Sequence, residues 1–102
     1  MLLEIAEIEV KPGKEDEFAA AMRDGGLPYL AACEGVVSVR FGRGVENPSK
    51  FTFNVVWTEL EAHAAAKHLE SFGKFRAAFG DLTCGGTMSH YVMGEAIPGA
   101  SA

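Results

Sequence analysis

Hydrophobic and polar residues alternate along four stretches of this chain, and between these stretches apolar residues recur every three or four positions. Alternation is typical of half-buried strands, and the longer period is typical of amphipathic helices. The pattern therefore predicts strands at residues 2–10, 36–44, 51–57 and 85–94, and it predicts helices at residues 15–25 and, as a consecutive pair, within 58–80.

Glycine and proline interrupt the first helical pattern. Gly25 and Gly26 lower the helix propensity, and Pro28 cannot donate a backbone hydrogen bond to the preceding turn. We therefore expect the first helix to stop before Pro28 and a short second helical segment to run from Leu30 to Cys33.

Two polar signals predict where the later helices begin. Thr58 and Glu61 fit the capping box T-x-x-E, in which the threonine hydroxyl accepts a backbone N–H and the glutamate reaches back. We expect the first helix of the pair to start at Thr58. Ser71 is a candidate N-cap for the second.

The order of the predicted elements defines a fold class. Strand, helix, strand, strand, helix pair and strand give the β-α-β-β-α-β unit of ferredoxin-like α+β folds, a four-stranded antiparallel sheet with helices on one face. We place the last strand beside the second. With 102 residues, the chain forms a single domain, predicted at residues 1–94, followed by a flexible small-residue tail at 95–102.

The strands carry apolar residues on both faces of the predicted sheet. In the third strand, one face would show Phe51, Phe53, Val55 and Trp57, and the other would show Thr52, Asn54, Val56 and Thr58. Since a helix layer covers only one face, Val56 and the valines of the second strand indicate a partner on the other. We predict a homodimer joined through the sheet faces, twice the 10.9 kDa of the chain.

Charge excludes several classes of partner. Fourteen acidic and nine basic residues give a net charge of -5, without a Lys/Arg cluster, which disfavours nucleic acid and anionic membranes. Glu4, Glu7 and Glu9 interrupt the apolar N-terminal run, and no run approaches the roughly 20 residues of a membrane span. We expect a cytoplasmic protein.

The potential metal ligands show no standard spacing. Cys33 and Cys84 are expected to be two reduced thiols, since they match neither a disulfide framework nor a zinc motif. His63 and His68 are five residues apart, so they cannot chelate one ion as an i, i+4 pair would. We predict no metal site and no cofactor.

His63 occupies a position in the later helices where an apolar residue is expected, with the small residues 64–66 beside it leaving space. One interpretation is a buried histidine that hydrogen-bonds a backbone carbonyl or Tyr91. The other is a general base or a hydrogen-bond donor to a substrate hydroxyl, because imidazole changes protonation near neutral pH. His90 in the last strand is the candidate inward-facing partner that approaches His63.

Five segments together resemble the antibiotic biosynthesis monooxygenase domain family. They are "KPGKEDEF", "EGVVSVRFGRG", "FTFNVVWTELEAH", "SFGKFRAAFG" and "SHYV". The resemblance implies a dimeric α+β barrel and a family that spans cofactor-free oxygenases, haem-degrading enzymes and quorum-signal isomerases. The haem-degrading relatives carry a histidine, a tryptophan and an asparagine at positions that align with Arg76, Ala66 and Ala6, so the resemblance does not extend to haem chemistry.

These observations favour a cofactor-independent monooxygenase that acts on a small aromatic molecule in an apolar pocket between sheet and helices. The alternatives are a non-catalytic binding or structural dimer and a non-oxidative isomerase. The predicted catalytic residues are His63 and His90, and the predicted substrate contacts are Trp57, Phe53, Phe72, Phe75, Asn54 and Tyr91. Asn54 and Trp57 are three apart in a strand, so they point to opposite faces and cannot both serve one cavity.

Overall fold

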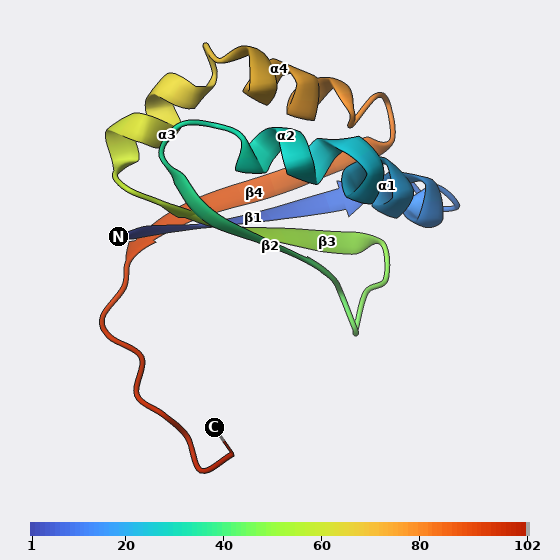
Figure 1. Cartoon of the computed structure of the whole chain (residues 1–102). Helices are drawn as coiled ribbons and strands as arrows, with labels where there is room; N and C mark the ends of the chain where they lie inside the picture. The colour runs from blue at the N-terminus through green and yellow to red at the C-terminus, as the bar shows by residue number, and fades with distance from the viewer. Residues whose placement is uncertain (102) are drawn as a thin grey trace.

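A computed structural model of the protein describes residues 1–101. Four antiparallel strands form one sheet in the order β2-β3-β1-β4. The strands are β1 (Leu2–Val10), β2 (Val36–Arg43), β3 (Lys50–Trp57) and β4 (Thr83–Val92). The helices are α1 (Glu15–Ala21), the π-helix η1 (Met22–Gly26), α2 (Leu27–Ala31), α3 (Leu60–Ala66) and α4 (Glu70–Ala77). All the helices lie on one side of the sheet (Figure 1), which confirms the ferredoxin-like α+β fold.

The place of the last strand differs from the prediction. β4 pairs with β1, with Glu4 opposite His90, and it does not pair with β2. The crossover through α3 and α4 carries the chain from β3 past the central strand β1 to the opposite edge of the sheet. β4 is therefore an edge strand, and it brings His90 beside the N-terminal strand.

The first helix is not interrupted before Pro28 as predicted. The helical path continues from α1 through η1 into α2, because the Leu27 N–H donates to the Met22 carbonyl five residues earlier. This wider turn absorbs Gly25 and Gly26, and Pro28 then falls in the first turn of α2, where a missing N–H costs little. The second segment consequently begins at Leu27 instead of Leu30.

Both predicted helix caps are also wrong. α3 begins at Leu60 after Glu59, with no side-chain cap, and the Thr58 N–H donates to the Gly35 carbonyl at 2.8 Å. α4 begins at Glu70, also without a side-chain cap. The Ser71 hydroxyl lies 3.3 Å from the Cys33 sulfur instead. Contacts with Gly35 and Cys33 have thus engaged the Thr58 N–H, which the predicted capping box would have used, and the predicted capping hydroxyl of Ser71.

The core lies between the sheet and the helices. β3 alternates strictly, with Phe51, Phe53, Val55 and Trp57 buried against the helices and the intervening residues only partly covered. The opposite sheet face has no covering layer within the described chain (Figure 1). Strand alternation therefore sets which side chains can reach a site beneath the helices.

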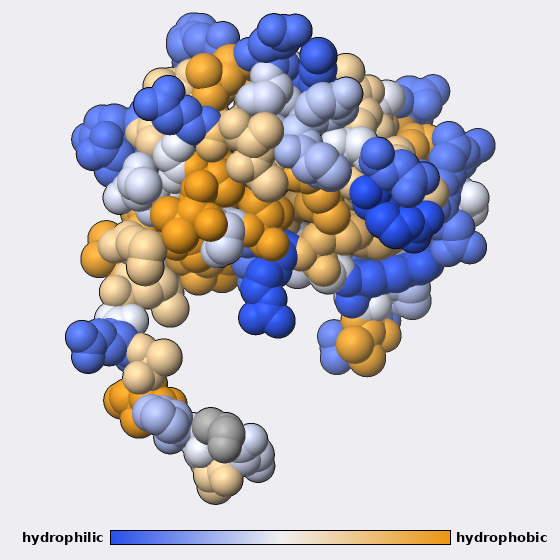
Figure 2. Space-filling model, viewed as in Figure 1, coloured by the Kyte–Doolittle hydropathy of each residue, from blue (hydrophilic) through white to orange (hydrophobic). Residues whose placement is uncertain are grey.

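The chain beyond β4 projects from the body of the molecule. Residues 93–101 contain no helix or strand and are exposed, and the space-filling view shows them as an extension with isolated hydrophobic residues (Figure 2). The domain boundary at residue 94 stays a prediction, and Ala102 lies outside the described residues. Among residues 1–101, no helix is long and apolar enough to cross a membrane.

Candidate functional site

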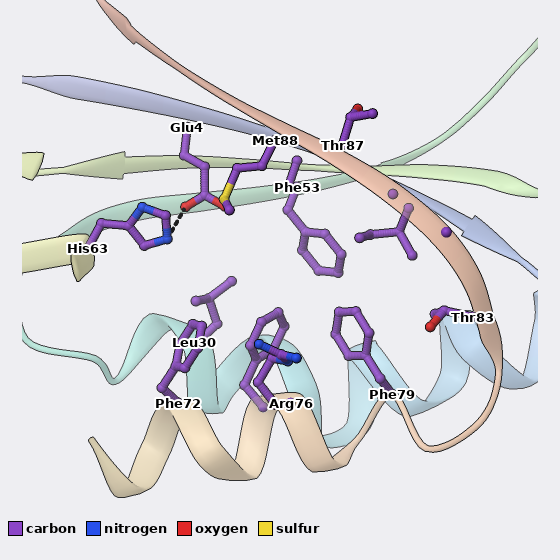
Figure 3. Close-up of a pocket in the computed structure, with 15 residues that line it drawn as sticks. Glu4, Leu30, Phe53, His63, Phe72, Arg76, Phe79, Thr83, Thr87 and Met88 are labelled. Atoms are coloured by element: carbon purple, nitrogen blue, oxygen red, sulfur yellow. Dashed lines mark ion pairs between the residues drawn. The ribbon is translucent and has the colours of Figure 1, made fainter. Parts of the chain in front are cut away.

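A cavity of 540 Å³ lies between the inner face of the sheet and the helices α2 and α4 (Figure 3). Gly85 and Gly86 of β4 and Ala6 of β1 leave space on the sheet side, and aromatic rings from α4 form the opposite wall. Gly86 is required there, since a Cβ would lie 2.8 Å from the Glu7 carbonyl oxygen. The lining residues are Glu4, Ala6, Ile8, Leu30, Phe53, His63, Phe72, Phe75, Arg76, Phe79, Thr83, Gly85, Gly86, Thr87 and Met88.

Glu4 and His63 line one end of this cavity, and His90, which does not line it, lies against His63; we refer to the three side chains as the Glu4–His63–His90 cluster. The His63 Nδ1 atom lies 2.6 Å from His90 Nε2, and His63 Nε2 lies 3.4 Å from Glu4 Oε1. Glu4 is buried, at 7% exposure, and His63 and His90 are partly exposed. Glu4 comes from β1, His63 from α3 and His90 from β4, so three separate elements build the cluster.

Trp57 fixes the position of the two inner members. Its indole Nε1 donates to Glu4 Oε1 at 2.8 Å, and its ring stacks on His63 with centroids 4.8 Å apart. Trp57 is fully buried at the end of β3, so it cannot rotate away without opening the core. It is a supporting residue behind His63 and does not line the cavity.

The contacts favour one tautomer of His63. The carboxylate of Glu4 can only accept, so the tautomer that suits both neighbours has the hydrogen on His63 Nε2 and an Nδ1 lone pair facing the Nε2–H of His90. Burial lowers the pKa of His63 below its ordinary value of 6.5, the Glu4 charge opposes this effect, and His90 adds to it. The neutral imidazole is therefore the favoured form at neutral pH, with a lone pair at Nδ1.

The structure brings together some of the predicted site residues. His63, Phe53, Phe72 and Phe75 line the cavity, and the predicted proximity of His90 to His63 is confirmed. The contact arises through the pairing of β4 with β1, not with β2 as expected. The roles of these residues stay predictions.

Other predicted contacts lie elsewhere. Asn54 and Tyr91 occupy the opposite sheet face, where Asn54 accepts a hydrogen bond from the Thr52 hydroxyl at 3.2 Å and Tyr91 is 49% exposed. Residues 64–66 do not line the cavity, and Ala66 is buried in the core. The glycines of β4 line the cavity and the alanines of α3 do not, but Gly85 and Gly86 pair with Glu9 and Ile8, at the end of the sheet away from His63.

Sequence reasoning missed the two charged residues of the cavity wall, Glu4 and Arg76. Glu4 shares a strand face with Ala6 and Val10, and a carboxylate on the apolar face of a strand was the available signal. Arg76 contributes to the wall from α4, and among residues 1–101 it forms no ion pair. Figure 3 shows its side chain between those of Phe72 and Phe79.

Solved structures of similar fold come from several bacteria. A candidate antibiotic biosynthesis monooxygenase from Bordetella bronchiseptica has 24% identity and a TM-score of 0.81, over 92% of this chain and 97% of that chain. A candidate from Deinococcus radiodurans has 15% identity and a TM-score of 0.76, over 96% and 97% of the two chains. At these identities the likeness establishes the fold.

The family itself is established by its sequence model. The model described as "Antibiotic biosynthesis monooxygenase" matches residues 1–78, which include β1, α3 and α4 and therefore two members of the Glu4–His63–His90 cluster. No curated protein matches the chain significantly. The chain belongs to the antibiotic biosynthesis monooxygenase family.

Proposed function

We propose that this protein is a cofactor-independent monooxygenase that oxidises a small, electron-rich aromatic molecule, such as a phenol or quinol, inside the cavity. The observation that carries the proposal is that His63 lines an aromatic cavity of 540 Å³ while its Nδ1 lies 2.6 Å from His90 Nε2. The buried Glu4 carboxylate orients His63, as the third member of a catalytic triad orients its histidine.

In the proposed reaction, a substrate hydroxyl replaces His90 as the hydrogen-bond donor to His63 Nδ1 and transfers its proton there. The Glu4 carboxylate 3.4 Å from Nε2 stabilises the resulting imidazolium. The phenolate transfers an electron to O₂, and the radical pair combines to form a C–O bond. Loss of the ring proton and cleavage of the O–O bond then give a quinone and water, so one oxygen atom enters the product and four electrons leave the substrate.

The cavity wall suggests the shape and charge of the substrate. Phe53, Phe72 and Phe75 offer ring edges and faces for stacking against an aromatic molecule. Arg76 supplies a cation that forms no ion pair within residues 1–101, in a protein whose net charge is -5. We therefore propose a substrate with a hydroxyl that reaches His63 and a carboxylate or second phenolate oxygen that reaches Arg76.

The proposed assembly is a homodimer through the open sheet face. Leu3, Ile5 and Val56 lie partly exposed on that face, and the partly exposed Tyr91 lies beside them across the β1–β4 pairing. Burying such a surface against a second copy would remove apolar area from water. Sedimentation should give twice the 10.9 kDa chain mass, whereas a stable monomer at micromolar concentration would contradict the dimer.

The test of function is oxygen consumption with a panel of hydroxylated aromatic compounds, in the presence of a chelator. We expect one O₂ consumed per product, with one atom of ¹⁸O₂ in the quinone and one in water. Turnover without O₂ consumption would favour the isomerase instead, and tight binding without turnover would favour a binding protein. His63→Gln should abolish most of the activity, while His68→Gln, at an exposed position close to α3, is the matched control.

A further inference from the structure

The Glu4–His63–His90 cluster is more than a hydrogen-bonded histidine pair, because it combines two imidazoles with a buried carboxylate. One nitrogen from each histidine and one oxygen from Glu4 all lie within 4.8 Å of one another. Donors that surround a transition-metal ion at about 2.1 Å, with angles between 90° and 109°, are separated by roughly 3.0 to 3.4 Å. The 2.6 Å contact of His90 is with Nδ1 of His63 and the 3.4 Å contact of Glu4 is with Nε2, so side-chain rotations are needed to bring one nitrogen of each histidine and one Glu4 oxygen around one ion.

The charge of Glu4 provides a second observation. Its carboxylate is 7% exposed, and among residues 1–101 no lysine or arginine forms an ion pair with it. Its contacts are the Trp57 N–H and the His63 imidazole. A buried carboxylate is costly without a compensating positive charge, and a cation between Glu4, His63 and His90 would supply that charge.

From these two observations we propose that Glu4, His63 and His90 form a binding site for one divalent first-row transition-metal ion. Two imidazoles and one carboxylate suit Zn²⁺, Fe²⁺, Co²⁺, Ni²⁺ or Cu²⁺, whereas Mg²⁺ and Ca²⁺ prefer oxygen donors. Trp57 would be the outer partner that orients the carboxylate, a role that hydrogen-bond donors commonly take around metal ligands. Glu4 and His63 line the cavity, so the remaining coordination positions face it.

The prediction of no metal from sequence considered the cysteines, the standard motifs and the His63/His68 pair, all judged by spacing along the chain. His63 and His68 indeed cannot share an ion, but the fold supplies the other ligands from β1 and β4. Metal binding and proton abstraction exclude each other in this cluster, because a bound ion would occupy the lone pair with which His63 accepts a proton. The metal site does not rest on the proposed oxidation, since binding can be measured without a substrate.

The experiment uses the full chain, stripped with a chelator and dialysed, titrated with Zn²⁺ by calorimetry and with Co²⁺ by visible absorption. We expect one ion per chain and a Co²⁺ spectrum typical of nitrogen and oxygen ligands. His90→Ala and Glu4→Gln should each weaken binding by about 10-fold or more. His90 is partly exposed on an edge strand, so its truncation should leave the fold intact, as circular dichroism would verify.

His68→Ala and Cys84→Ala are the matched controls, because both residues are exposed potential ligands outside the cluster. Unchanged affinity in the controls, together with loss in the cluster variants, supports the proposal. Binding that disappears in a control variant, that survives His90→Ala and Glu4→Gln, or that is absent at about 100 μM free ion overturns it. A negative result in the oxidation assay would not change the measured metal affinities, so each proposal can be disproved without the other.

Discussion

The two ends of β3 bury their side chains in different ways. Near α1, Phe51 packs against Phe18 with ring centroids 5.2 Å apart, and Phe18 also meets Phe79 at 5.3 Å. Six residues along the same strand face, Trp57 is equally buried but donates to Glu4 and stacks on His63. We call the first end, formed by Phe18, Phe51 and Phe79, the phenylalanine cluster. These three side chains have no polar group to satisfy. At the Trp57 end, each buried polar atom needs a specific hydrogen-bond partner.

This difference separates the residues that stabilise the fold from the residues of the candidate site. Apolar packing tolerates any close arrangement of rings and contributes mainly to the free energy of folding. The polar end gains little from burial itself, because Glu4 and the histidines must be desolvated. The proposed reaction or ligand would account for these groups lying under the helices, beside a cavity.

The largest effect that would test this division is expected at the phenylalanine cluster. Phe18 is fully buried against four other aromatic rings. Phe18→Ala should lower the free energy of unfolding by about 3 to 5 kcal/mol, measured by urea denaturation. Phe72→Ala is the control, since Phe72 is only partly buried and lines the cavity. An equal loss of unfolding free energy in Phe18→Ala and Phe72→Ala would contradict a special contribution of the phenylalanine cluster to stability.

At the polar end, the expected large effect is on turnover. His63→Gln keeps a hydrogen-bonding side chain but cannot accept a proton near neutral pH, so the rate should fall by ~10²-fold or more. The melting temperature should change little. Rates would be measured on a substrate identified by oxygen consumption. Full activity in a stable His63→Gln protein would leave His63 as a binding or packing residue.

A smaller effect, on KM, is expected for Arg76 in the cavity wall formed by α4. Arg76→Gln removes a cation from an exposed position, so we expect unchanged stability and a KM raised by about 10-fold, with kcat unchanged, for a substrate with an anionic group. Lys74→Gln is the control, because Lys74 lies over the Tyr29 ring and does not line the cavity. If both variants behave as the parent protein, Arg76 does not contact substrate.

The smallest effect is the pH dependence of stability in the chelator-treated protein. Because burial holds the pKa of His63 below 6.5, the unfolded chain binds the proton more readily than the folded one. This residue's contribution to stability is therefore complete above pH 6.5 and is lost as the pH falls from 6.5 toward the lower folded pKa. Urea denaturation across this range should show a shallower slope for His63→Gln. Phe18→Leu, at the phenylalanine cluster, should keep the slope of the parent protein.

The sequence by itself determined the order of elements and the face of each strand. Alternation in residues 51–57 placed Phe53 and Trp57 on one face and Asn54 on the other, because successive side chains of a strand point to opposite sides. The first strand was predicted at residues 2–10, the bounds that the structure gives. Such features depend on local periodicity and need no knowledge of distant partners.

Only the tertiary structure decided the neighbour of β4, the path of the first helix and the composition of the site. Glu4 and His90 are 86 positions apart and meet because β4 pairs with β1, a choice that no local pattern encodes. The helix continues through Gly25 and Gly26 because a π-turn and packing outweigh local propensity. The chemistry of the cluster therefore depends on the tertiary structure, because the side chains around a buried carboxylate decide what it can bind or stabilise.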